Sequence, residues 1–485
     1  MSPLPVLPDK STGKLVRFRI HANPLGVHFG FSRHLIPKPL THLDLNIASL
    51  LCQHTTEILY IYTFPHNLPN IPHRTKAINS SIPGILKMSP TTIRWGILAT
   101  GGIAETFTKD LLVDPNTRGV HDLRHTVVAA ASSSSKSRAE DFLRTVSAPS
   151  SAKAYGSYEE LVQDANIDIV YVATPHSHHF QNALLALEAG RNVLCEKAFT
   201  VNAAQAKKLV GIAREKNLFL MEAVWTRYFP LSIYVRDVIT SGKIGHVSRV
   251  FAENSKPNDP EVAFAGNKHR LVNPDLAGGT LLDLGIYSLT WVFQTLYTTQ
   301  PAATAKPPTV VSAMTKYPAT GVDERTSILL VFPRPEDQGG DAHGIATTGF
   351  RTTTDTDGKG TSGPAVRIMG SKGEIQVWPP VFRPTKTRLV LTDGTTEVKE
   401  WPQPGPGEGS GWYNGFLDAK HAEGEGHGMF WEADEAARAI IKGRKEGRFE
   451  SLDESVLIME VMDEVRRQHG LKYPEKIETT EKTSL

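Results

Sequence analysis

Cysteine is scarce in this sequence, and long hydrophobic runs are missing from it. Two cysteines among 485 residues, Cys52 and Cys195, can form neither a disulfide framework nor, by themselves, a four-ligand zinc site. This composition is typical of a reducing compartment, and we expect a cytoplasmic one. No run of about 18 apolar residues occurs, so we expect no membrane span. The opening MSPLPVLPDKSTGK lacks the apolar segment of a secretory signal.

Acidic residues are nearly missing from the first 87 positions. This segment holds nine Lys and Arg against three acids, Asp9, Asp44 and Glu57, and shows no sustained helix or strand period. Met88, directly before the first clear strand, is a candidate natural start. Residues 1–87 are therefore interpreted as a disordered or targeting extension, a mitochondrial transit peptide included, or as a product of gene prediction. Since the whole chain carries +2 and this segment +6, the remainder carries −4, which disfavours nucleic acid as its ligand.

The length of the chain points to more than one domain. At 485 residues, 40% of them hydrophobic, it can bury an ample core and exceeds the usual size of one domain. Near residue 222, strands that alternate with helices give way to strands that follow one another. We predict a nucleotide-binding domain over 88–222, an α+β domain over 223–475 and a tail over 476–485.

The segment TIRWGILATGGIAETFTKDLL is predicted to form a strand, a tight turn and a helix. Its turn fits the pattern G-x-G-x-x-G, with Ala99 in the first place, Gly101 in the second and Ala104 in the third. The second place matters most, because there the backbone must approach a pyrophosphate without a side chain between them. The amides that begin the helix would hold the phosphates. The same residues would also suit an ordinary tight turn.

The loop after the next strand, HTVVAAASS, indicates which dinucleotide fits. A fold that binds NAD places Asp or Glu here, for the ribose 2′-hydroxyl. This chain has serines at 132–135, followed by Lys136 and Arg138. Hydroxyl groups and two cations suit a 2′-phosphate, so the pattern favours NADP. The alternative is a Ser-rich loop before a solvated helix.

The segment YGSYEELVQDANIDIVYVATPHSHHFQNALLALEAGRNVLCEK continues the alternation of strands and helices. Continuous apolar strands at 167–173 and 192–195 indicate a parallel, doubly wound sheet. Such sheets bind ligands at the carboxyl ends of their strands. Lys197 follows one of these ends and is expected to face a nicotinamide instead of solvent. Histidines at 176, 178 and 179 lack an accompanying set of carboxylates or cysteines, so no metal site is predicted.

Alternating strands dominate the chain after residue 223. The segments KIGHVSRVFAENS, TVVSAMTKYP, RTSILLVFP, AVRIMGSKGEIQVW and TRLVLTDGTTEVKEW predict an open, mostly antiparallel sheet with one face covered. Stretches 300–308, 335–363 and 402–411 are rich in Gly, Pro, Ala, Thr or Asp and are interpreted as surface insertions. The helical portion beyond 430 is expected to pack back over the fold.

The segment LAGGTLLDLGIYSLTWVFQTL is predicted to be a buried helix, because its positions are apolar all round. Asp283 and Tyr287 lie four residues apart and so share one face. A buried carboxylate and a buried phenol both need partners. The pair is either an acid–base device or a helix-packing Asp beside a satisfied core Tyr.

Six segments carry a resemblance to a known family. They are WGILATGGIA, CEKAFTVNAAQ, MEAVWTRYFP, GGTLLDLGIYSL, GSKGEI and EADEAARAI with LDESVLIMEVMDEVRRQ, and they occur in this order over residues 92–475. Together they resemble the glucose–fructose oxidoreductase/inositol dehydrogenase family of NAD(P)-dependent enzymes. The branch that they resemble most contains the dimeric dihydrodiol dehydrogenases and the fungal NADP-dependent D-xylose 1-dehydrogenases. The resemblance implies a Rossmann domain followed by an α+β domain with an open sheet.

The resemblance also implies a role for each matching residue. Tyr287 would be the general base toward the substrate hydroxyl, and Lys197, from the family's Glu-Lys-Pro signature, would lower the pKa of Tyr287 and bind the same oxygen. Asp283 would complete the catalytic group. Substrate-binding residues would be Trp225, Arg270 and Tyr287. Cofactor-binding residues would be Ala99, Thr100, Gly101, Gly102, Ile103, Ala104, Ser133, Ser134, Arg138, Thr174, Pro175, His176, Glu196 and Lys197.

The sequence departs from the family pattern in two places. Ala198 replaces the proline of the signature, which loosens a backbone constraint on Lys197. Serine near position 134 replaces an arginine that mammalian members place there for the cofactor. The expected activity is oxidation of D-xylose to its lactone with NADP by a homodimer joined through the open sheet. Three alternatives stay open: a trans-dihydrodiol substrate, another sugar such as glucose or inositol, and a non-catalytic regulator that binds NADP.

Overall fold

The computed structural model describes residues 21–23, 26–28, 89–301, 303–415 and 423–483. The chain divides into two compact units, Met1–Pro83 and Gly84–Leu485. In the first unit the structure describes only two short antiparallel strands, β1 (His21–Asn23) and β2 (Gly26–His28). The interpretations of residues 1–87 otherwise lie outside the described residues. All elements below belong to the second unit.

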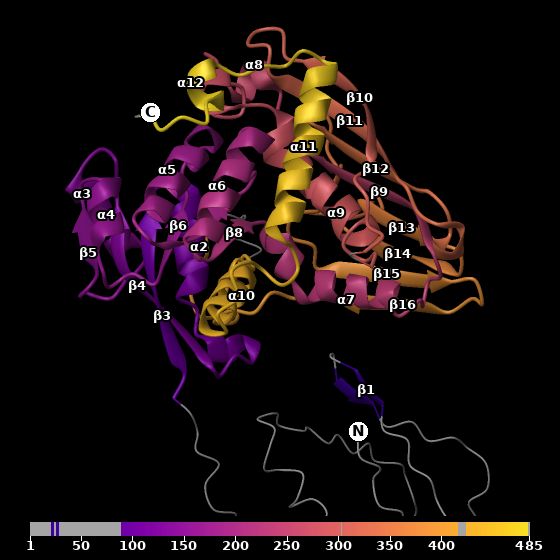
Figure 1. Cartoon of the computed structure of the whole chain (residues 1–485), viewed down its shortest axis with the longest axis horizontal. Coiled ribbons are helices and arrows are strands. Elements are labelled where there is room, and N and C mark those ends of the chain that lie inside the picture. The colour runs from indigo at the N-terminus through magenta and orange to yellow at the C-terminus, as the bar shows by residue number, and fades with distance from the viewer. Residues whose placement is uncertain (1–20, 24–25, 29–88, 302, 416–422, 484–485) are drawn as a thin grey trace, which may run out of the picture. The chain divides into compact units, whose positions relative to one another are not determined.

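A six-stranded parallel sheet forms the first layer of the second unit (Figure 1). Its strand order, β5-β4-β3-β6-β7-β8, is the doubly wound order in which the first strand lies beside the switch point. Strand β6 has the sequence IVYV with every residue buried, as expected for a strand covered on both faces. The parallel, doubly wound sheet predicted from the sequence is confirmed. The strands are β3 (Thr91–Leu98), β4 (Leu123–Ala131), β5 (Lys153–Tyr155), β6 (Ile169–Val172), β7 (Asn192–Glu196) and β8 (Leu220–Ala223).

Helices alternate with these strands, and polar side chains cap several of them. Ser135, Ser157 and Asn202 each accept a hydrogen bond from the backbone N–H three residues on, which satisfies a donor that the helix cannot. The first helix, α2, has no side-chain cap at its N-cap residue Gly101. The helices are α2 (Gly102–Leu111), α3 (Lys136–Thr145), α4 (Tyr158–Gln163), α5 (His176–Glu188) and α6 (Ala203–Glu215).

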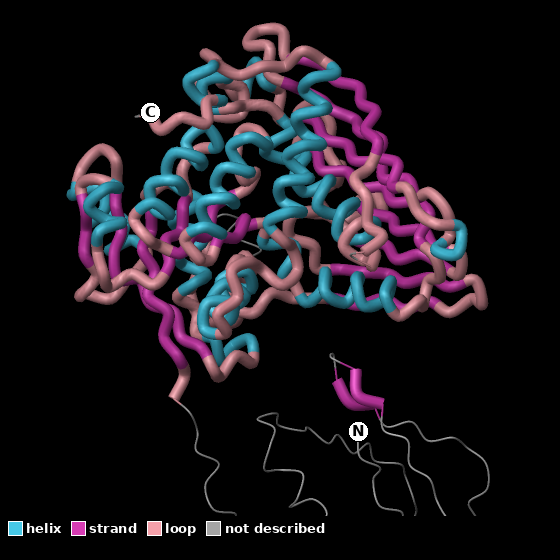
Figure 2. The backbone as a smooth tube through the Cα atoms, viewed as in Figure 1, coloured by secondary structure: helices cyan, strands magenta, loops and turns pink. Residues whose placement is uncertain are grey.

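An eight-stranded sheet forms the second domain, in the order β10-β11-β12-β9-β13-β14-β15-β16. Every pair is antiparallel except β9 with β12, so the predicted open, mostly antiparallel sheet is confirmed. Figure 2 shows helices against one face of this sheet. The strands are β9 (Val247–Ser255), β10 (Thr309–Lys316), β11 (Asp323–Phe332), β12 (Ala342–Gly349), β13 (Val366–Gly370), β14 (Gly373–Val377), β15 (Lys386–Leu391) and β16 (Thr396–Glu400).

The interpretation of residues 335–363 as a surface insertion is wrong for the middle of this stretch. Residues 342–349, inside the predicted insertion 335–363, form β12, which lies between β11 and β9 near the centre of the sheet. The strand is rich in small residues because a helix crosses it closely. A Cβ placed on Gly344 would lie 2.2 Å from Cγ1 of Val292. Small side chains here reflect close packing and not exposure.

The predicted buried helix begins with a π-helical turn, Leu281–Gly285, and continues as α9 (Ile286–Leu296). Every residue of both pieces is buried. The segment Pro274–Leu296 is long and apolar enough to cross a membrane by length and composition, which the sequence did not lead us to expect. However, 94% of the 18-residue apolar window within it lies buried inside the fold. It is the core helix of the second domain, packed against β9 and β12.

The C-terminal helices, which were expected to pack back over the fold, contact elements of both sheets' layers. Helix α10 (Phe430–Ile441) contacts α2, and α11 (Leu452–Gln468) lies beside α6 and reaches β10 (Figure 1). Helix α7 (Pro230–Thr240) packs against α9. Two single turns, α8 (Pro260–Ala263) and α12 (Glu475–Glu478), complete the elements.

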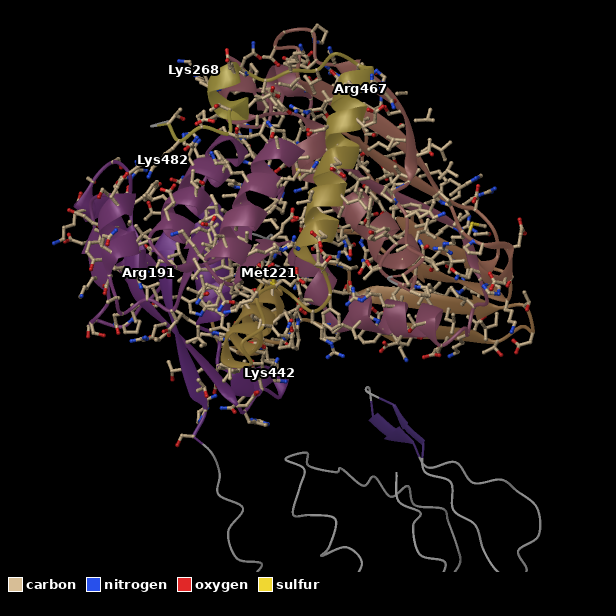
Figure 3. The ribbon with its side chains drawn as sticks, in the orientation of Figure 1. Arg191, Met221, Lys268, Lys442, Arg467 and Lys482 are labelled. Atoms are coloured by element: carbon tan, nitrogen blue, oxygen red, sulfur yellow. The ribbon has the colours of Figure 1, made fainter. Side chains whose placement is uncertain are left out.

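The tail predicted over 476–485 is bound to the first domain over its described part. The side-chain amide of Gln205 donates to the carbonyl oxygens of Ile477 (2.8 Å) and Thr479 (2.9 Å). Asn202 Nδ2 donates to Glu478 O at 2.9 Å. Lys482, labelled in Figure 3, forms an ion pair with Glu188 on α5. The last turn is therefore part of the fold, because Gln205 of α6 and its N-cap residue Asn202 bind the backbone oxygens of this turn.

Candidate active site

A cavity of about 390 Å³ lies at the carboxyl ends of β3, β6 and β7, beneath the second sheet. This edge is where a doubly wound sheet binds its ligands. The cavity brings together residues from both domains, including most of those predicted from the sequence. Its lining consists of Gly101, Gly102, Ile103, Ala173, Thr174, Pro175, His176, His179, Glu196, Lys197, Trp225, Lys256, Arg270, Asp283, Leu284, Tyr287 and Phe382.

The glycine turn leaves open space where a phosphate would fit. A Cβ placed on Gly101 or Gly102 would meet nothing within 4 Å, and no side chain caps the amides that begin α2. Helix N-terminal amides with open space before them bind anionic groups. Ala99, in the first place of the motif, has φ +92°, the backbone region for which the motif ordinarily uses glycine. Ala99, Thr100 and Ala104 shape the turn without lining the cavity.

The serine loop lies at the end of β4, beside the glycine turn, because β3 and β4 are parallel neighbours. Ser132 Oγ and Ser134 Oγ are 3.0 Å apart, and Arg138 Nη1 donates to Ser134 Oγ at 3.3 Å. Ser133, Ser134 and Arg138 are exposed and lie outside the cavity lining. Arg138 thus brings a guanidinium to the position where the sequence analysis noted a missing arginine. An exposed cluster of two hydroxyls and a cation suits a phosphate.

Lys197 follows directly on β7, whose last residue is Glu196. Its ammonium donates to the backbone oxygen of Asp283 at 2.8 Å and to Asp283 Oδ1 at 3.2 Å. Arg270 Nη1 donates to the same Oδ1 at 2.8 Å. Burial raises the pKa of Asp283, but the charges of Lys197 and Arg270 outweigh this and hold it well below its usual range. Asp283 is therefore an ionised carboxylate shared by two cations.

Two contacts fix where Lys197 points. One is the pair of hydrogen bonds to Asp283; the other is the ring of Tyr287, whose centroid lies 4.9 Å from the Lys197 ammonium. The peptide between Lys197 and Ala198 is cis. Ala198 was expected to leave the direction of Lys197 open. In the structure, the Lys197 side chain points toward the π-helical turn and Tyr287.

Although the Lys197 ammonium lies beside the ring of Tyr287, the pKa of Tyr287 is not lowered overall. Burial, with the negative charges of Glu196 and Asp283, raises the pKa of Tyr287 well above its ordinary value. The charge of Lys197 is largely compensated by Asp283, which lies within 3.2 Å of it. Tyr287 is therefore a neutral phenol here. Added positive charge in the cavity would be needed to favour its ionised form.

Three aromatic rings, those of Trp225, Tyr287 and Phe382, line part of the cavity. The rings of Trp225 and Tyr287 stack with centroids 6.0 Å apart, and Phe382 lies 5.8 Å from Tyr287. The indole N–H of Trp225 donates to the backbone oxygen of Phe382 at 2.6 Å, which fixes the two relative to each other. His427 packs edge-on against Trp225 at 4.7 Å. Such rings suit the apolar face of a sugar or of a cyclic diol.

The start of the π-helical turn is held by one buried carboxylate. Asp323 Oδ2 accepts hydrogen bonds from Thr280 Oγ1 (2.6 Å) and from the backbone N–H of Leu281 (2.7 Å). Gly279 makes this possible, since it has φ +122° and a Cβ there would lie 2.0 Å from Asp323 Oδ1. The close approach sets the start of the helix that carries Asp283 and Tyr287.

Glu196 and the histidines complete the polar lining. Tyr171 donates its hydroxyl hydrogen to Glu196, and burial raises the pKa of Glu196 to about 6. Burial lowers the pKa of His176 well below its usual value and that of His179 to about 4, so both rings are neutral. Among the described residues, no group of three or more His, Cys, Asp or Glu is arranged to hold a metal ion.

Five lining residues are not among the predicted site residues: Ala173, His179, Lys256, Leu284 and Phe382. Lys256 follows the end of β9 as Lys197 follows the end of β7, and that parallel could have pointed to it. Phe382 comes from the loop PPVFRPTK, whose sequence carries no functional signal. His179 was noted only as part of a histidine cluster.

Comparison with known proteins identifies two matching family models. The model described as an oxidoreductase family with an NAD-binding Rossmann fold matches residues 93–224. The model of the GFO/IDH/MocA C-terminal domain matches residues 233–376.

Curated relatives match nearly along their whole length. An NADP(+)-dependent D-xylose 1-dehydrogenase of Hypocrea jecorina is 54% identical over 394 residues, which are 81% of this chain and 95% of the relative. Trans-1,2-dihydrobenzene-1,2-diol dehydrogenases of Sus scrofa and Homo sapiens are 36% and 34% identical. Each of these two matches covers 79% of this chain and 98% of the relative.

Solved structures share the fold at low identity. A 3-ketoreductase of Actinomadura kijaniata, in complex with NADP and TDP-benzene, has a TM-score of 0.57 at 22% identity. Levoglucosan dehydrogenase, in complex with NADH and levoglucosan, has a TM-score of 0.61 at 15% identity. Each comparison covers 78% of this chain and 98% of the other. At this identity the likeness supports the two-domain fold.

Proposed function

The chain belongs to the GFO/IDH/MocA family of oxidoreductases, and from this premise we propose that it oxidises D-xylose at C1 to the lactone with NADP. The observation that carries the proposal is the cavity in which Lys197, Asp283 and Tyr287 meet the glycine turn and an aromatic wall. The substrate follows from the 54% identity to a D-xylose 1-dehydrogenase over 95% of that relative's length.

The residues fit NADP on two observations of the structure. The open space before the amides of Gly101 and Gly102 would take the pyrophosphate. The hydroxyls of Ser133 and Ser134 with the Arg138 guanidinium would take the ribose 2′-phosphate, and no carboxylate of that loop would repel it. Thr174, Pro175 and His176 would border the nicotinamide half.

The chemistry needs one base and one group to hold the reacting oxygen. When bound, NADP supplies the hydride acceptor. After Tyr287 has lost its own proton to solvent, its phenolate would take the proton of the C1 hydroxyl as the C1 hydrogen leaves as hydride, and the Lys197 ammonium would stabilise the same oxygen. Asp283 would hold Lys197 in place, and Arg270 would compensate the charge of Asp283. Because burial raises the pKa of Tyr287 well above its ordinary value, oxidation should be faster at alkaline pH.

Two rival functions differ in measurable ways. A trans-dihydrodiol would suit the apolar rings of Trp225 and Phe382, and relatives at 34–36% identity carry that name. A regulator that binds NADP without turnover would have no need of the buried group formed by Lys197, Asp283 and Tyr287.

The test is an initial-rate assay of the full-length chain with NADP or NAD. D-xylose, D-glucose, inositol and a trans-dihydrodiol are supplied in turn, and formation of the reduced cofactor is followed by absorbance. We expect turnover of D-xylose with NADP at a higher kcat/KM than any other pair. Binding of NADP without turnover of any compound would favour the regulator and refute the proposal.

A second copy of the chain is proposed as the partner of the open sheet. A row of cross-strand neighbours crosses its outer face: Val311, Leu329, Ile345 and Phe251. Phe251 is 40% exposed, and Arg249 and Glu253 lie on either side of it along the outer face of β9. A two-fold axis at Phe251 would place the Arg249 of each copy near the Glu253 of the other, so the surface complements itself.

The oligomeric state tests this partner. Sedimentation of the full-length chain should give a dimer, and Phe251→Asp should shift it to monomer while Val262→Asp should not. Val262 is 77% exposed and lies on α8, away from the row. A dimer that survives Phe251→Asp would place the interface elsewhere.

A further inference from the structure

Lys256 is the one cation of the cavity lining that has no carboxylate partner among the described residues. The lining contains three cationic side chains, and two of them, Lys197 and Arg270, share Oδ1 of Asp283. The Lys256 ammonium makes no ion pair within 4 Å in the part of the chain that the structure describes. The Lys256 ammonium lies over the ring of Phe382, whose centroid is 4.9 Å away.

The backbone of Lys256 is held firmly although its side chain reaches into the cavity. Its N–H donates to the backbone oxygen of Gly349, which extends the pairing of β9 with β12 by one residue. The side chain is half-buried, so its ammonium is partly removed from water. Burial, with the repulsion of Lys197 and Arg270, lowers the pKa of Lys256, while Asp283 opposes the decrease. A half-buried donor with this environment is stabilised by any ligand that brings oxygen acceptors.

The position of Lys256 differs from that of the catalytic lysine. The Lys197 ammonium lies over the ring of Tyr287, and the Lys256 ammonium lies over the ring of Phe382. These two rings belong to one cluster, with centroids 5.8 Å apart. A ligand whose reacting hydroxyl meets Tyr287 can therefore present other groups to Lys256.

We propose that Lys256 binds the substrate through a hydroxyl remote from the oxidised carbon and so selects polyhydroxylated substrates. This inference rests on the proposed oxidation of D-xylose. An aldose carries hydroxyls around its whole ring, so an acceptor remains for Lys256 when C1 is at Tyr287. A trans-dihydrodiol carries its two hydroxyls on adjacent carbons, and its far side is apolar. Lys256 thus distinguishes the two substrate classes that the curated relatives represent.

A contact far from the reacting carbon is made equally in the ground state and in the transition state. Removing it should therefore raise KM and leave kcat nearly unchanged. A hydrogen bond from a charged donor to a buried ligand hydroxyl corresponds to an effect of about 10- to 100-fold. By contrast, if Lys256 had only a structural role, its replacement would change KM and kcat by the same factor for every sugar.

The test compares Lys256→Met with wild type on D-xylose and on its 2-, 3- and 4-deoxy analogues, using the full-length chain with saturating NADP. We expect the variant to raise KM for D-xylose about 10-fold or more, with kcat within about 3-fold. With the wild-type protein, the KM for one deoxy analogue should exceed the KM for D-xylose by a similar factor. With Lys256→Met, the KM values for that analogue and for D-xylose should be equal. The matched control is Lys268→Met, which removes an exposed lysine at the molecular surface (Figure 3).

The outcomes separate this inference from the proposed function. Wild-type turnover of D-xylose decides the function, and the deoxy series decides the role of Lys256. Titration of D-xylose into the NADPH complex by calorimetry reads the same contact without turnover, and Lys256→Arg keeps the charge if the Met variant does not fold. An unchanged KM in Lys256→Met, or equal losses for every analogue in both proteins, would overturn the inference.

Discussion

Replacement of Gly279 by alanine is predicted to damage both stability and catalysis. Gly279 has φ +122°, and an added Cβ would lie 2.0 Å from Asp323 Oδ1. Asp323 would have to move, although its other oxygen holds Thr280 and the backbone of Leu281 at the start of the π-helical turn. The same turn carries Asp283, so the displacement reaches the ion pair with Lys197.

The expected loss of unfolding free energy in Gly279→Ala has two parts, which a control variant can separate. A non-glycine residue in such a conformation costs about 1–3 kcal/mol, and displacing a packed neighbour costs about 1–3 kcal/mol more. Gly266 lies earlier in the segment between α8 and the π-helical turn and has φ +81°, but a Cβ there would meet nothing within 4 Å. Gly266→Ala should therefore show the conformational part alone, about 1 kcal/mol after the gain from a less flexible unfolded chain.

The assay is denaturant unfolding together with steady-state kinetics on D-xylose. Gly279→Ala should lose about 3 kcal/mol of unfolding free energy and at least about 10-fold in kcat, because the acid–base group is displaced. Gly266→Ala should keep its kcat. Equal stability losses in the two variants, with kcat retained in both, would refute the argument that the Gly279–Asp323 approach positions the helix.

Further variants test separate parts of the site. Asp283→Asn keeps the shape but removes a negative charge that raises the pKa of Tyr287, so the rising limb of the pH–rate profile should move to lower pH; an unmoved limb would contradict this. Lys197→Met removes a cation beside the same ring, so any remaining activity should need higher pH, and an unchanged profile would exclude its electrostatic role. Arg138→Ala should raise the Kd for NADP about 10-fold and leave the Kd for NAD unchanged in calorimetry, whereas equal changes would remove it from the 2′-phosphate site. Truncation after Glu475 should lower the thermal midpoint by several degrees, since buried Gln205 loses two acceptors; truncation of 484–485 alone should not.

Much of the nucleotide-binding half could be predicted from the sequence because its signals are local. A continuous apolar strand, a glycine turn and a helix follow one another over residues 91–111, and each has a distinct pattern. The carboxyl ends of parallel strands must share one edge, so the position of Lys197 near the cavity followed from topology. Asp283 and Tyr287 followed from helical spacing, and both line the cavity, Asp283 from the π-helical turn and Tyr287 from α9.

The features that the sequence analysis missed depend on contacts between distant segments. Strand β12 has the sequence AHGIATTG, which resembles a loop, because α9 crosses it too closely for larger side chains. The net pKa of Tyr287 depends on its burial and on Glu196, 91 positions earlier in the chain, so the lysine signature alone did not indicate the direction of the overall shift. Phe382 and Lys256 enter the cavity from separate loops that the second sheet brings together. The cytoplasmic location stays a prediction.

The most direct test of the proposed function is the turnover of Tyr287→Phe on D-xylose with NADP, beside wild type and Tyr413→Phe. Tyr413 is 39% exposed and lies outside the cavity lining, so its variant controls for the loss of a hydroxyl as such. Tyr287→Phe should lower kcat by about 10² or more while the Kd for NADP changes little, because only the acid–base group is removed. Near-wild-type turnover in Tyr287→Phe would contradict the account.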